Sequence, residues 1–249
     1  MNATLAQDLG TVITKELKEF FASGGERSRY LSLIVLGVFG IIVPLITGSH
    51  DRSWVTSAIP ADIYGLLLPI VLIVSVGADS FAGERERHTL ETLLASRLPD
   101  QAIFFGKLIA ITLFGWGQSL LTALVALIVV NLAHPGALAL YPMPTVVAIV
   151  VFGLLVALVG AATASLVSLR ASTVRQAQQM LSIGLMVIFF GITFGIQALP
   201  AQLRQQLSSS ANAGMLGLEV AALLIVLAAI LIAWAMALFR RARLILSAS

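Results

Sequence analysis

Residues 78–107 read ADSFAGERERHTLETLLASRLPDQAIFFGK and form the most highly charged stretch of the 249-residue chain. Its acidic residues are Asp79, Glu84, Glu86, Glu91 and Asp100, and its basic residues are Arg85, Arg87, Arg97 and Lys107. Charged residues make up only 11% of the chain and hydrophobic residues 59%. The stretch lies between two long apolar runs. It predicts a loop that meets a polar partner outside a membrane, with a solvated connector as the simpler alternative.

The composition around this loop is that of a membrane protein. The mean hydropathy is +1.00, and several apolar runs reach the roughly 20 residues that cross a bilayer. The chain has no Cys, which excludes disulfides and Cys-based metal sites. The pI near 9.7 does not require nucleic acid as a partner, because basic residues beside apolar spans face the cytoplasm and anionic lipid.

Six apolar segments indicate an all-α integral membrane protein that forms one transmembrane domain over residues 1–249. We place the spans at 30–47, 62–82, 103–133, 145–169, 179–199 and 214–239. The charged loop then covers residues 83–102. The third span is longer than one bilayer, so its first turns, with Lys107, are expected to project into the cytoplasm.

The distribution of Lys and Arg predicts the orientation of the spans. With the N-terminus inside, thirteen of the 15 basic residues lie on the cytoplasmic segments and only Arg52 and Arg204 lie outside. Positively charged residues accumulate on the cytoplasmic side of membrane proteins. We therefore expect both termini in the cytoplasm.

An amphipathic helix is predicted within residues 1–29, ahead of the first span. One face carries Leu9, Val12, Ile13, Leu17, Phe20 and Phe21, and the other carries Lys15, Glu16, Lys18 and Glu19. Glu16, Glu19 and Glu26 before the apolar run argue against a cleaved signal peptide. The pattern is typical of a helix that lies on the inner membrane surface, with an ordinary soluble amphipathic helix as the alternative.

The charged loop resembles the first cytoplasmic loop of the ABC type 2 exporter permeases. The residues that carry the resemblance are Phe81, the run 84–87, Thr89-Leu90-Glu91, Leu93-Leu94, Pro99 and Gly106-Lys107. Those permeases have six membrane helices, an elbow helix before the first span, and an ATPase that is often a separate polypeptide. The N-terminal amphipathic helix is similar to that elbow helix.

Local chemistry supports a short helix inside the loop, at 90–95. Thr89 is a suitable N-cap, and Glu91 would lie in the first turn, near the positive end of the helix dipole. Leu90, Leu93 and Leu94 would share one apolar face. By the resemblance, this helix couples the permease to its ATPase.

Other residues of the loop are expected to mark the ends of its neighbours. Gly83 can end the preceding span, Pro99 prevents simple continuation, and Asp100 can cap the next helix. In the second cytoplasmic loop, 169–178, Ser172 or Thr173 could cap a short helix, which is either a minor coupling contact or a basic turn. The coupling residues are then Glu84, Glu86, Arg87, Thr89, Leu90, Glu91, Leu93, Leu94 and Arg175.

The sequence contains no motif for nucleotide binding or catalysis. The motif G-x-x-x-x-G-K-[ST] is absent, since Gln101 stands where the first Gly is needed and Leu108 follows Lys107. No paired His spacing and no Ser/His/Asp arrangement is evident. We therefore expect that the chain is not itself an enzyme and binds no cofactor or metal, and that ATP and Mg are held by a partner.

Polar residues within the spans are candidates for a substrate pathway. Gln118, Ser119 and Thr122 lie deep in the third span, where they either line a cavity or bond to neighbouring helices. Asp79 and Glu219 lie near span ends, where a hydrated end residue is the simpler interpretation. The outer connection at 200–213 either forms short surface or re-entrant helices or is a plain polar loop.

The resemblance implies the permease subunit of an ATP-driven exporter in a bacterial cell inner membrane. Two copies of the chain would pair with two copies of a cytoplasmic ABC ATPase, with membrane lipid around them and an accessory protein on the outer side left open. One alternative is an ion-driven secondary transporter that uses Asp79 or Glu219. Another is a membrane scaffold that transports nothing. The transported substrate does not follow from the sequence.

Overall fold

The computed structural model describes residues 3–20, 26–47, 53–89, 97–134, 138–200 and 213–239. Within these ranges the chain forms helices and no strand. Three predictions lie outside the described residues: the short loop helix at 90–95, the outer connection at 201–212, and the basic residues Arg240, Arg241 and Arg243.

The chain begins with helix α1 (Ala3–Lys18). The first span consists of α2 (Glu26–Gly37), the π-helical η2 (Val38–Ile42) and α3 (Val43–Thr47), and the short α4 (Ser53–Thr56) follows. The second consists of η3 (Ala61–Leu67) and α5 (Leu68–Glu86), and the third is α7 (Asp100–Ala133). The fourth consists of α8 (Met143–Val147), η4 (Ala148–Phe152) and α9 (Gly153–Arg170). The last two are α10 (Val174–Ala198) and α12 (Ala213–Leu238).

Six of these helical segments are long and apolar enough to cross a membrane, which confirms an all-helical, multi-pass membrane protein. Some helices are longer than the apolar runs. The second span was expected to end at 82, yet α5 continues to Glu86; the fifth was expected from 179, yet α10 begins at Val174. These extra turns carry polar residues that are bonded inside the protein, so the helix does not end where the apolar run ends.

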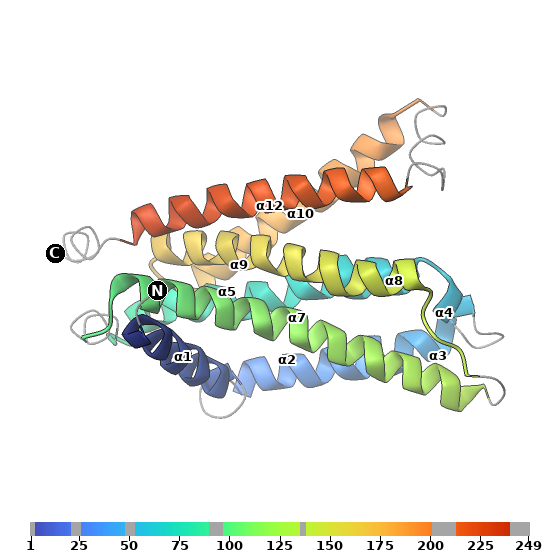
Figure 1. Cartoon of the computed structure of the whole chain (residues 1–249), viewed down its shortest axis with the longest axis horizontal. Coiled ribbons are helices and arrows are strands. Elements are labelled where there is room, and N and C mark those ends of the chain that lie inside the picture. Colours follow the sequence, from blue (N-terminus) through green and yellow to red (C-terminus); the bar gives the residue numbers. More distant parts are fainter. Residues whose placement is uncertain are drawn as a thin grey trace.

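The helices lie side by side along the long axis of the molecule (Figure 1). Helix α1 and the C-terminal end of α12 lie at the same end of the bundle, which is the end where the charged stretch leaves α5 (Figure 1). We call it the charged end.

Helices α5, α7 and α9 form the centre of the bundle because small residues let them approach closely. A Cβ on Gly77 of α5 would lie 2.5 Å from the Cβ of Ala164 in α9. A Cβ on Gly115 of α7 would lie 2.6 Å from a side-chain carbon of Ile73 in α5. Close backbone approach of this kind is the usual way in which membrane helices pack.

Ser168 of α9 adds hydrogen bonds to this contact. Its Oγ accepts from the backbone N–H groups of Phe81 and Ala82, at 3.1 and 2.9 Å, and donates to the carbonyl of Ala78 at 2.8 Å. The side chain is fully buried. One hydroxyl thus joins α9 to three backbone groups of α5.

The opposite end of the bundle is held by polar contacts to backbone groups. Asn131 of α7 exchanges two hydrogen bonds with the backbone of Ala139, at 2.9 and 2.8 Å. The hydroxyl of Tyr141 donates to the carbonyl of Ala123 at 3.1 Å, and burial raises the pKa of Tyr141 to about 12, so the proton stays on the oxygen. These bonds fix the connection that enters α8.

Candidate coupling site at the charged end

Four consecutive charged residues, Glu84, Arg85, Glu86 and Arg87, lie at the C-terminal end of α5. Successive residues of an α-helix point about 100° apart, because one turn holds 3.6 residues. The four side chains therefore leave the helix in different directions. We call these four residues the charged turn.

Glu84 pairs with Lys107, near the start of α7. The Lys107 ammonium lies 2.8 Å from Glu84 Oε1 and 2.9 Å from Oε1 of Glu16, on α1. The side chains of Glu84, Lys107 and Glu16 are 9%, 2% and 4% exposed, respectively. The Lys107 ammonium also lies 5.6 Å from the centre of the Phe81 ring. Buried charges persist in proteins when they are paired and hydrogen-bonded. The cluster therefore joins α5, α7 and α1.

This cluster corrects one prediction. Glu16 was assigned to the polar face of α1, but its side chain is buried against α7. Lys107 lies in the turns of the third span that were expected to project into the cytoplasm, and its side chain is buried within the protein as well. In both cases an opposite charge elsewhere in the chain compensates for the loss of hydration.

Arg85 binds the C-terminal end of α9. Its guanidinium donates to the carbonyl of Leu169 at 3.0 Å and to the carbonyl of Ala171. The last carbonyl groups of a helix have no partner within the helix, and a cation near them is favoured by the helix dipole. Arg85 thus holds the end of α9 against the end of α5.

Glu86 binds the N-terminal end of α10. Its carboxylate accepts from the backbone N–H of Val174 at 3.2 Å, which places a negative charge at the positive end of the helix dipole. The same terminus is capped by Thr173, whose hydroxyl accepts from the N–H of Gln176 at 3.2 Å. Thr173 is thus a cap, but of the fifth span and not of a separate short helix. Arg175 is exposed in the first turn of that helix.

Arg87 turns back along α5 and pairs with Asp79 at 3.3 Å. The two side chains meet over Gly83, where a Cβ would lie 2.0 Å from an Asp79 oxygen. Gly83 therefore makes room for the pair within the helix. The prediction that Gly83 ends the helix was wrong, since α5 continues to Glu86. Both charged side chains are about half exposed, and a pair of this kind contributes about 0 to 1 kcal/mol.

Helix α5 ends in two reverse backbone hydrogen bonds. The N–H of His88 donates to the carbonyl of Arg85 at 3.1 Å, and the N–H of Thr89 donates to the carbonyl of Glu84 at 2.9 Å. His88 has a positive φ of 56°. This is a Schellman ending, with His88 where Gly is usual. The hydroxyl of Thr89 also donates to the Glu84 carbonyl at 3.2 Å, so in the described residues Thr89 caps α5.

The remaining loop predictions have different outcomes. Leu90, Glu91, Leu93 and Leu94 lie outside the described residues, so their assignment to a coupling helix stays a prediction. Asp100 was expected to be the N-cap of the third span, but Pro99 occupies that position and Asp100 lies in the first turn. Pro at this position leaves the cap without a side-chain hydrogen bond.

The pathway candidates of α7 are hydrogen-bonded within the chain. Gln118 donates to the carbonyl of Ser32 at 3.4 Å, Ser119 donates to the carbonyl of Tyr64, and Thr122 donates to the carbonyl of Gln118 at 2.8 Å. All three side chains are buried. Their contacts are those of polar residues between packed helices, and a place in a substrate pathway stays a prediction.

Asp79 and Glu219, the acidic pathway candidates, are not buried. Asp79 pairs with Arg87 near the end of α5, and Glu219 is exposed near the start of α12. The structure does not bring these two residues together with Gln118, Ser119 and Thr122 into one described cavity.

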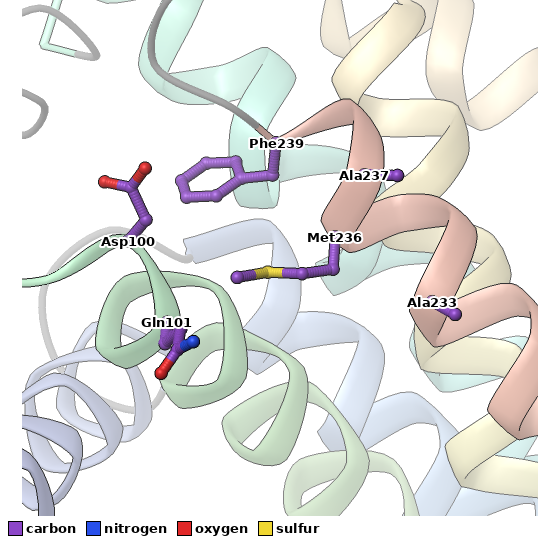
Figure 2. Close-up of a pocket in the computed structure, with 6 residues that line it drawn as sticks. All are labelled: Asp100, Gln101, Ala233, Met236, Ala237 and Phe239. Carbon is purple, nitrogen blue, oxygen red and sulfur yellow. The ribbon is translucent and has the colours of Figure 1, made fainter.

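A pocket of about 430 Å³ lies at the charged end, between α7 and α12. It is lined by Asp100, Gln101, Ala233, Met236, Ala237 and Phe239. Met236 and Phe239 point toward the first turn of α7 (Figure 2). The Phe239 ring also lies 5.3 Å from that of Phe81 and 5.8 Å from that of Phe104, which attaches the end of α12 to the charged end.

Within the described ranges no group of His, Asp and Glu could hold a metal ion.

Comparison with known proteins gives one family. The model of a family described as "ABC-2 family transporter protein" matches residues 39–239. The match includes the charged turn and all six spans except the beginning of the first. No curated protein matches the chain.

Proposed function

The chain belongs to the ABC-2 family of transporter proteins, and on this basis we propose that it is the permease subunit of an ATP-driven exporter with a separate ATPase. A partner ATPase is a general property of such permeases. The finer features of the proposal are a homodimer of this chain, two ATPase copies that hold ATP and Mg, export as the direction, and a bacterial inner membrane.

One observation carries the mechanistic part of the proposal. The charged turn lies directly before the loop at 90–96, and its side chains contact α7, α9 and α10. Lys107 of α7 in turn pairs with Glu16 of α1. A force on that loop would therefore act on four other helices through short polar contacts. We propose that the ATPase binds the loop through Glu91 and the apolar side chains of Leu90, Leu93 and Leu94.

This arrangement assigns two kinds of role to the predicted coupling residues. Glu84 is buried and Arg87 is paired within α5, so we propose that they act by holding the base of the loop. Arg175 is exposed beside the charged turn and is available for a direct contact with the ATPase.

The ion-driven alternative lacks support from the site. A coupled ion site in a membrane needs a carboxylate that is shielded from bulk water and faces a pathway. Asp79 is about half exposed and paired with Arg87, and Glu219 is exposed. Neither residue has the surroundings that such a site requires.

Purification of the tagged chain from its native membrane in mild detergent tests the proposal. We expect a polypeptide with a Walker A motif to co-purify in equal amount, and vanadate-sensitive ATP hydrolysis to accompany it. A pure chain with no nucleotide-binding partner and no ATP hydrolysis would contradict the proposal.

Labelling of single cysteines tests the orientation, with no native Cys to remove. In intact cells, Ser172→Cys should be shielded from an impermeant thiol reagent, whereas Ala139→Cys should react. The reverse result would place both termini outside the cytoplasm.

A further inference from the structure

Helix α1 is attached to α7 through one line of contacts. Val12 lies against Gly106, where a Cβ would be 2.5 Å from Val12 Cγ1. Glu16 pairs with Lys107, and the Phe20 ring lies 5.4 Å from the ring of Phe114. Residues 12, 16 and 20 are four apart, so they lie on the same side of the helix. The ion pair is the central contact of the three.

Lys107 is shared between two carboxylates from different helices. Its ammonium lies 2.9 Å from Glu16 of α1 and 2.8 Å from Glu84 of α5. Among the described residues, the second oxygen of Glu84 is buried without a hydrogen-bond partner. Without Lys107, two buried carboxylates would face each other with no cation between them, and this arrangement is strongly unfavourable.

Glu84 also lies at the start of the loop. Its carbonyl accepts the N–H of Thr89 at 2.9 Å in the ending of α5, while its side chain holds Lys107. The first residues of the loop are therefore connected to α1 through only two residues, Glu84 and Lys107. The connection is buried along its length, so water does not screen it.

We propose that Lys107 is a positioning residue that locks α1 to the charged end of α5 and α7, so that the three helices move as one body when the ATPase acts. The last clause rests on the proposed function. The locking itself is a property of this chain alone and can be tested without the ATPase.

Spin labels on the full-length chain in lipid nanodiscs measure the locking. Thr11→Cys on α1 and Leu124→Cys on α7 are exposed positions. Gly106, which α1 contacts, lies about 27 Å from Leu124 at 1.5 Å per residue, a separation that pulsed electron paramagnetic resonance measures well. The lock predicts one narrow distance peak in the otherwise unchanged chain.

Three variants separate the lock from general stability. Lys107→Met should lose the narrow peak because α1 is no longer held. Lys107→Arg keeps a cation between the carboxylates of Glu16 and Glu84, so it should keep the peak. Lys18→Met is the matched control, since Lys18 is exposed at the end of the same helix, and it should leave the peak unchanged.

The complex with the co-purified ATPase tests the movement. The narrow peak should keep its position when ATP is trapped with vanadate, and Lys107→Met should lose the stimulation of ATP hydrolysis by the permease while the ATPase still co-purifies. Lys107→Arg should retain that stimulation.

The inference is overturned if Lys107→Met keeps the narrow peak, or if the peak of the unchanged chain shifts when ATP is trapped. A Lys107→Arg variant whose peak is as broad as that of Lys107→Met while the protein remains folded, with unchanged melting in detergent, also overturns it. A different result would contradict the proposed function, namely that no ATPase co-purifies with the unchanged chain.

Discussion

Helices α5, α7 and α9 are packed very differently from α10 and α12. In the most apolar part of each span, 50%, 44% and 39% of the residues of the first group are buried, against 12% and 11% for α10 and α12. The central helices meet through Gly, Ala and Ser and through buried hydrogen bonds. The outer helices instead expose large side chains, among them Ile183, Phe189, Phe194, Leu223 and Ile230.

This difference separates two uses of an apolar sequence. In the central helices small residues permit backbone contact, so each position has a defined neighbour. In α10 and α12 the exposed apolar side chains suit lipid or a second copy of the chain. The same substitution should therefore have a large effect in one group and a small effect in the other.

The largest difference is expected for a glycine made bulky. Gly77→Leu forces a side chain into α9, because even a Cβ would lie 2.5 Å from Ala164. Overpacking typically costs 1–3 kcal/mol and sometimes more, so we expect a loss of about 3 kcal/mol or failure to fold. Gly184→Leu in α10 is the control, since nothing lies within 4 Å of its Cβ position. Melting in detergent measures both, and equal losses would contradict the comparison.

A smaller effect is expected for a hydroxyl group. Ser168→Ala removes three hydrogen bonds between α9 and α5 and should lower stability by about 1–2 kcal/mol. Thr193→Ala removes only a bond within α10 and should change stability by less than about 0.5 kcal/mol. Unfolding in denaturant compares the two variants. If Thr193→Ala lowers stability as much as Ser168→Ala, the contact of Ser168 with α5 does not stabilise the protein more than a hydrogen bond within one helix, and the comparison fails.

The contact of Arg170 in α9 with Trp234 in α12 should contribute less to stability than the Ser168 contact. The Arg170 guanidinium of α9 lies 5.0 Å from the centre of the Trp234 ring in α12. Partly exposed cation–π pairs contribute about 0.5–1 kcal/mol. Arg170→Gln should therefore cost about that much in the same denaturant measurement. A loss larger than that of Ser168→Ala would mean that α12 is held more firmly than its exposure suggests.

The smallest effect is a gain at the end of α5. His88 has a φ of 56°, which a residue with a Cβ adopts at a cost of about 1–2 kcal/mol. Glycine relieves this cost but loses more entropy on folding, so His88→Gly should stabilise the chain by roughly 0.5 kcal/mol. His88→Val, which is β-branched, should destabilise it. Equal melting of the two variants would show that the ending of α5 does not form.

Hydrophobicity and length were sufficient to predict the six helices, since each span needs only a long apolar run. Helix ends were harder, because the polar turns at the ends are stabilised by distant residues. Gly83 shows this well: a glycine before charged residues indicates a helix end, yet here it makes room for Asp79 and Arg87 within the helix.

The charged turn has contacts within the chain that were not predicted, and its role in binding a partner stays a prediction. Glu84 and Glu86 were predicted to face a partner, and both have partners within the chain. Arg85, Lys107 and Glu16 were not among the predicted site residues. Each of these residues is far in sequence from its partner; Glu16 and Lys107, for example, are 91 positions apart. No local sequence pattern therefore predicts the contact. The available signal was Lys107, a charged residue within the apolar run of the third span.

The most direct test of the account is the binding of the ATPase to variants of the loop. Glu91→Arg, and separately Leu93→Ser with Leu94→Ser, should leave the permease in the membrane with unchanged melting. An interfacial charge left unpaired costs about 2 to 5 kcal/mol, which corresponds to about 25-fold weaker binding or more. Glu19→Arg, a charge reversal at a partly exposed residue directly after α1, is the control and should bind normally. The account predicts loss of co-purified ATPase from both loop variants, and full binding with full stimulation of ATP hydrolysis in both would contradict it.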